Sequence, residues 1–137
     1  LNALHAIPAT EHTYRAYQQR INKEDSMALY MLQAKYTPEA IRNIAESGSN
    51  REDVARAVVE QCGGKLIGFY GMLGQDYHIA IIVEYDDLPS YLGTVLTTVL
   101  GGAIADFKTI ALYSSDDVVK ASAVYQANKA AYSPPSS

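Results

Sequence analysis

Apolar side chains along the chain follow two different spacings, and the alternation between them predicts a series of strands and helices. Four segments rich in aromatic, aliphatic and β-branched residues predict β-strands: residues 27–36 (MALYMLQAKY), 65–73 (KLIGFYGML), 77–85 (YHIAIIVEY) and 106–114 (DFKTIALYS). The turn Gly74-Gln75-Asp76 joins the second and third of these and predicts a hairpin.

Helical spacing with matching capping residues fills the segments between the strands. The first helix is predicted to begin at Thr37-Pro38, to pass through a loop or kink at residues 47–50, and to stop at Gly63-Gly64. The second spans residues 88–102, and a C-terminal helix is predicted after a cap at Ser115-Asp116-Asp117. The predicted order is therefore βαββαβ followed by a helix.

The predicted strands are apolar on both faces. In the first strand Tyr30 and Leu32 face one way and Leu29 and Met31 face the other, and the third strand shows the same pattern. Two helices cover only one face of such a sheet, so we expect the other face to pack against the sheet of a second copy. The alternative is that the N-terminal segment or the C-terminal helix covers that face within one chain.

Composition narrows the class of protein. The 137 residues suffice for one domain, and a formal charge of -4 without a run of basic residues argues against a nucleic-acid partner. The single cysteine, Cys62, forms no intrachain disulfide and supplies no zinc pair, which fits a cytoplasmic location. No apolar run approaches the roughly twenty residues of a membrane helix, so no membrane association is expected.

Several short motifs in this order resemble the GYD domain family of small bacterial proteins. They are YTPEAIRNI, then CGGKLIGFYGMLG, then DYHIAIIVEYDD, and finally the strand DFKTIAL. The resemblance implies an α+β fold of the dimeric α/β-barrel superfamily: a ferredoxin-like βαββαβ sandwich with a four-stranded antiparallel sheet. The activity of the family is largely uncharacterised. Relatives in the superfamily use the cavity between sheet and helices for small aromatic substrates, cofactor-free oxygenation, isomerisation or haem.

The chain is accordingly divided into three parts. Residues 1–26 form an N-terminal extension or arm, residues 27–119 a GYD-like ferredoxin-fold domain, and residues 120–137 the end of a C-terminal helix with its tail. The extension lacks a strong apolar face, so we expect it to dock on the domain or on a partner.

The hairpin before the third strand carries the candidate catalytic residues. His78 stands where the family has its aspartate, and Asp76 in the lengthened turn is a substitute carboxylate. His78 suits a general base, a ligand to metal or haem, or a residue that ties down the turn. No second histidine or carboxylate lies at a metal-binding spacing, so no metal site is predicted, and a cofactor stays unknown.

Tyrosine supplies the candidate ligand-binding residues. The sequence contains eleven tyrosines but only two phenylalanines and no tryptophan. We expect Tyr30, Tyr70 and Tyr77 to line a cavity between sheet and helices, offering apolar walls with hydroxyl donors. The alternative is that these tyrosines fill a wet interface between copies.

Two classes of function remain open. In the first, the chain binds or transforms a small molecule in the cavity between sheet and helices. The resemblance to the superfamily implies an aromatic molecule. In the second, it is a structural or assembly protein that forms a homodimer or larger homo-oligomer through its sheet and N-terminal arm. Whether the protein is an enzyme is not decided by the sequence.

Overall fold

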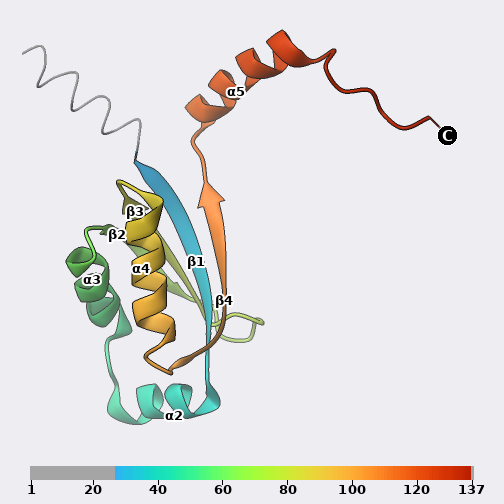
Figure 1. Cartoon of the computed structure of the whole chain (residues 1–137). Helices are drawn as coiled ribbons and strands as arrows, with labels where there is room; N and C mark the ends of the chain where they lie inside the picture. Colours follow the sequence, from blue (N-terminus) through green and yellow to red (C-terminus); the bar gives the residue numbers. More distant parts are fainter. Residues whose placement is uncertain (1–26, 137) are drawn as a thin grey trace, which may run out of the picture.

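The computed structural model describes residues 27–136, which form a four-stranded antiparallel sheet with helices packed on one face (Figure 1). The elements in chain order are β1 (Ala28–Tyr36), α2 (Pro38–Ser47), α3 (Arg51–Gln61), β2 (Lys65–Gly71), β3 (Ile79–Tyr85), α4 (Leu88–Val99), β4 (Ile104–Leu112) and α5 (Ser115–Asn128). The strand order is β2-β3-β1-β4, with β1 paired to β3 and β4 and β3 also paired to β2. This confirms the predicted ferredoxin-like α+β fold. The predicted arm, residues 1–26, lies outside the described residues.

The capping residues explain where most helices begin. The Thr37 hydroxyl accepts a hydrogen bond from the Ala40 N–H at 3.1 Å and starts α2. Gly48, at a φ of 64°, ends α2 in the left-handed region, so the predicted loop or kink is a loop between two separate helices. The prediction for the C-terminal helix was wrong by one residue, because Ser114 rather than Ser115 is the N-cap, in a reciprocal capping box with Asp117.

Most strand ends shift slightly from their predicted positions. Strand β3 begins at Ile79 rather than at residue 77, because residues 73–78 belong to the turn of the hairpin. Strand β4 begins at Ile104, two residues before the predicted start, because its first residue pairs with Tyr36. The predicted helix 88–102 ends at Val99.

The core lies between the sheet and helices α3 and α4. Three tyrosines fix α4 on the sheet: the Tyr91 ring stacks on Tyr30 at 4.3 Å between centroids and meets Tyr85 edge-on at 5.7 Å. The Tyr91 hydroxyl shares a hydrogen bond with Thr109 at 2.7 Å, and Tyr85 pairs likewise with Thr94. Burial raises the pKa of Tyr85 and of Tyr91, so both hydroxyls stay neutral and hydrogen-bonded in the core.

The other face of the sheet carries no described helix, and it combines apolar residues with polar ones such as Glu84, Asp106 and Lys108. The strand register places an apolar set on this free sheet face, and we define it by Leu29, Met31, Ile82, Ile110 and Leu112. Helix α5 extends away from the sheet and leaves this face open (Figure 1). The free sheet face matches the expectation of two apolar faces, while its partner stays a prediction.

A close approach of backbone to an aromatic ring makes Gly64 a sensitive position. A Cβ at residue 64 would clash with the Tyr85 ring, which is buried. We expect Gly64→Ala to lower the free energy of unfolding by about 1–3 kcal/mol through overpacking. Gly71→Ala is the control, because a Cβ there meets nothing within 4 Å. Urea denaturation checks the pair, and equal stabilities would contradict this packing.

Candidate functional site

Two adjoining pockets lie on the helix side of the sheet. The inner pocket, of about 230 Å³, lies between α3, α4 and the sheet, and its walls are almost entirely apolar. The outer pocket, of about 450 Å³, lies between α2, the start of α3 and the β2–β3 hairpin. Four residues line both pockets and join them: Tyr36, Arg51, Phe69 and Ile79. Both pockets are mostly apolar, and Arg51 and His78 are among the few polar residues that line the outer one.

His78 lines the outer pocket and also ties the hairpin to β1. Its side-chain Nδ1 accepts a hydrogen bond from the backbone N–H of Tyr36 at 3.1 Å. The backbone N–H of His78 donates to the Ala34 carbonyl at 2.9 Å. Because Nδ1 accepts, it carries no proton, and the neutral ring holds its proton on Nε2. Of the roles left open by the sequence, these hydrogen bonds correspond to a residue that ties down the turn, while a role of His78 towards a ligand in the outer pocket stays a prediction.

Arg51 is the residue that sequence reasoning missed. It is the first residue of α3, after the N-cap Asn50, and it lines both pockets. Its Nε is buried without a hydrogen-bond partner in residues 27–136, and Nη1 makes one long hydrogen bond to Ser49 at 3.5 Å. By contrast, Arg56 on the same helix is paired with Glu52 at 2.8 Å.

A signal for Arg51 does exist in the sequence. Arginine at the first position of a helix stands beside the positive end of the helix dipole, where a cation is disfavoured. Its presence there needs a reason outside helix stability. The reason is visible only when β1 and the hairpin are brought against α3, because Tyr36 and His78 share the outer pocket with Arg51.

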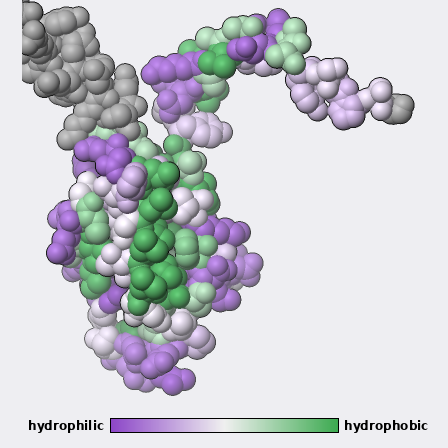
Figure 2. Space-filling view, viewed as in Figure 1, coloured by the Kyte–Doolittle hydropathy of each residue, from purple (hydrophilic) through white to green (hydrophobic). Residues whose placement is uncertain are grey.

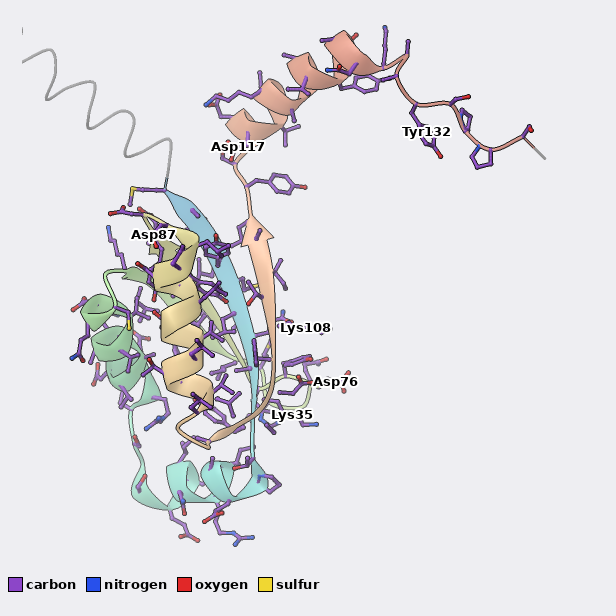
Figure 3. The ribbon with its side chains drawn as sticks, in the orientation of Figure 1. Lys35, Asp76, Asp87, Lys108, Asp117 and Tyr132 are labelled. Atoms are coloured by element: carbon purple, nitrogen blue, oxygen red, sulfur yellow. The ribbon has the colours of Figure 1, made fainter. Side chains whose placement is uncertain are left out.

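The other predicted site residues lie away from both pockets. Tyr30 stacks on Tyr91 in the core, and Tyr70 is 62% exposed beside Gly68 on the free side of the sheet. Asp76 is exposed in the hairpin turn, at the same end of the sheet as Lys35 and Lys108 (Figure 3). None of these residues joins His78 in the inner or outer pocket.

Tyr77 belongs to a polar group on the free side of the sheet. Its hydroxyl donates to Asp106 at 3.0 Å, and the Lys108 Nζ lies 5.0 Å from the ring centroid. Desolvation, followed by the hydrogen bond to Asp106, raises the pKa of Tyr77. The contacts of Tyr77 are therefore with β4 and not with the pockets.

We also searched the described residues for metal-binding clusters and for membrane-spanning helices. Residues 27–136 bring together no group of three or more His, Cys, Asp or Glu side chains able to hold a metal ion. Within the same part of the chain no helix combines the length and the apolar character needed to cross a membrane.

The fold and the pockets define a ferredoxin-like α+β domain with a hollow on the helix side of its sheet. The sequence pattern of the GYD domain family matches residues 30–122, and the chain belongs to that family. The match covers β1 through the first half of α5 and confirms the resemblance seen in the motifs. No curated protein matches the chain.

The chain also has matches of low sequence identity among solved structures. A NIPSNAP-like domain protein from Burkholderia xenovorans, described as uncharacterized, is 14% identical over 80% of this chain and 90% of its own, with a TM-score of 0.42. A dimeric protein of unknown function and ferredoxin-like fold from Bacteroides fragilis is 12% identical. The match covers 65% of this chain and 97% of that protein, with a TM-score of 0.39. A protein of unknown function from Rhodopseudomonas palustris is 18% identical. The match covers 73% of this chain and 92% of that protein, also with a TM-score of 0.39.

The two roles of His78 separate by substitution. His78→Leu leaves the Tyr36 N–H without its acceptor, and we expect a loss of about 1–3 kcal/mol in the free energy of unfolding. His78→Asn keeps an acceptor near the position of Nδ1 and should lose less. Chemical denaturation compares the two variants, and equal losses would show that the hydrogen bond to Tyr36 contributes nothing.

Proposed function

We propose that this protein binds a small organic molecule whose apolar or aromatic body enters the inner pocket and whose carboxylate or carbonyl oxygen lies in the outer pocket. A cavity of about 150 Å³ is enough for a benzene ring, and the inner pocket measures about 230 Å³. The inner walls include Phe69, Tyr85 and Tyr91, which suit the flat face of an aromatic ring.

The observation that carries this proposal is the buried Nε of Arg51, which has no hydrogen-bond partner among the described residues 27–136. A buried donor without an acceptor is costly, and a guanidinium forms its strongest hydrogen bonds with a carboxylate. His78 adds a second donor to the same pocket through Nε2. Two donors at the mouth of an apolar hollow favour a ligand with an acceptor at one end.

This arrangement also assigns the chemistry of His78. With its proton on Nε2, the neutral ring donates a hydrogen bond and is not set up as a base towards the pocket. A histidine that binds a metal through Nε2 commonly donates a hydrogen bond from Nδ1, whereas Nδ1 here accepts one from Tyr36. The proposed role is therefore to bind and orient an acceptor, and Asp76 takes no part in it.

Removal of the guanidinium tests the proposed role of Arg51. We expect Arg51→Gln to weaken binding of an aromatic carboxylate, probed with benzoate and phenylacetate, by about tenfold to a hundredfold, the value of a hydrogen bond to a charged group. Isothermal titration calorimetry measures the affinity. Arg42→Gln is the matched control, because Arg42 is exposed on α2 and lines neither pocket.

The neutral analogue benzyl alcohol checks the charge requirement. It should bind more weakly than benzoate to the unmodified protein, and the difference should shrink in Arg51→Gln. Equal affinity of both Arg variants for benzoate would contradict the assignment of Arg51.

The free sheet face favours assembly as a second function. Its apolar residues are half-buried, on a sheet whose opposite face is already covered. Sheets that pack face to face do so through such alternating apolar rows. We propose that two copies pair through the free sheet face, which leaves the helix-side pockets open to a ligand in each copy.

A charge placed in the middle of the free sheet face tests this pairing. Met31 is flanked by Ile82 and Ile110 in the neighbouring strands. Met31→Glu should therefore halve the particle mass, because a buried unpaired carboxylate is strongly disfavoured at an interface. Sedimentation velocity measures the mass, with Val119→Glu, at an exposed apolar residue on α5, as the control. An unchanged mass in Met31→Glu would rule out this surface.

A further inference from the structure

Tyr36 lies where the inner and outer pockets join, and its hydroxyl has no hydrogen-bond partner in residues 27–136. The residue is only 8% exposed. Its backbone N–H is bound to His78 Nδ1, and its ring lies nearly parallel to the His78 ring, with 6.3 Å between the centroids. The ring is therefore held in place, and the fold alone determines where the hydroxyl lies.

The other hydroxyls that line the two pockets all have partners within the described part of the chain. Tyr85 pairs with Thr94, and Tyr91 pairs with Thr109. The remaining hydroxyls either donate to a backbone carbonyl of α4 or accept from Arg51, and they belong to Thr97, Thr98 and Ser49. Tyr36 is therefore the exception. Phenylalanine would fill the same space in the core, so packing does not account for the hydroxyl, and a buried polar group without a partner is costly.

The Tyr36 hydroxyl also differs in chemistry from the two donors of the site. A guanidinium has no acceptor, and His78 carries its proton on Nε2, so Arg51 and His78 both recognise acceptors only. A tyrosine hydroxyl both donates and accepts. Tyr36 can therefore take a hydrogen bond from a ligand hydroxyl, which neither Arg51 nor His78 can do.

The position of Tyr36 indicates which ligand atom it would meet. In Figure 2 the hydrophobic band is α4, which covers the inner pocket, and the hydrophilic surface of α2 lies beside the outer pocket. A ligand with its ring in the inner pocket and its carboxylate in the outer pocket has its linking carbon where the pockets join. Tyr36 and Arg51 both line that junction.

We propose that the ligand is an aromatic 2-hydroxy acid whose 2-hydroxyl group hydrogen-bonds to the Tyr36 hydroxyl, an inference that rests on the proposed function of the two pockets. The carbon that bears this hydroxyl also bears the ring and the carboxylate. All three groups are then fixed, by the inner pocket, by Arg51 and by Tyr36. Three fixed groups on one carbon distinguish mirror images, so the site selects one enantiomer.

Mandelate and phenylacetate test the inference, because they differ only in the hydroxyl on the linking carbon. We expect one enantiomer of mandelate to bind the full chain about threefold to tenfold more tightly than phenylacetate, the value of one neutral hydrogen bond. The other enantiomer should bind more weakly than the first. In Tyr36→Phe the affinity for the preferred enantiomer should fall to that for phenylacetate. Isothermal titration calorimetry measures each affinity, and circular dichroism checks the fold of the variant.

Tyr70→Phe is the control, because it removes an exposed hydroxyl that lines neither pocket, and it should keep the preference. Equal affinities of the unmodified protein for phenylacetate and for both enantiomers would overturn the inference, and this comparison needs no variant. The proposed function would stand in that case if phenylacetate binding still depended on Arg51. A preference that persists in Tyr36→Phe would also overturn the inference. If neither compound binds, the inference and the proposed function fail together.

Discussion

The need to cover one apolar face of the sheet with only two helices determines the rest of the structure. The tyrosines Tyr30, Tyr85 and Tyr91 hold α4 over β1 and β3, while α3 packs over β2. The space between these two helices is not filled by side chains and forms the inner pocket. The pocket is therefore a direct consequence of where the helices are anchored, and the outer pocket continues it towards the start of α3.

Ligand binding and assembly are compatible in this fold, because they use different surfaces. The pockets open on the helix side, beside α2 and the hairpin, and the apolar residues of the free sheet face line neither pocket. Pairing of two copies through the free sheet face would therefore leave both pockets open to a ligand.

The local chemistry of the chain was enough to predict the fold, but most of the site depends on contacts between distant segments. The Thr37 cap, Gly63-Gly64 and the alternation in β3 act over a few residues, and the structure confirms them. The side of the sheet on which a tyrosine lies depends on register instead. The bulge between Leu66 and Gly68 reverses the alternation in β2, so Tyr70 faces away from the helices. Likewise, Arg51 and His78 line the same outer pocket only because the tertiary fold brings α3 and the hairpin together.

Within residues 27–136, Arg51 Nε has no acceptor, and we propose that it binds a ligand together with His78 Nε2 in the outer pocket. Nuclear magnetic resonance of backbone amides and of histidine and arginine side-chain nitrogens in ¹⁵N-labelled protein is the most direct test. We expect an unprotonated Nδ1 and a protonated Nε2 in His78. Added benzoate should shift the signals of His78 Nε2 and Arg51 Nε in a saturable way. A proton on His78 Nδ1, or shifts confined to the backbone amides of Tyr70 and Tyr77 on the other side of the sheet, would contradict the proposed binding site.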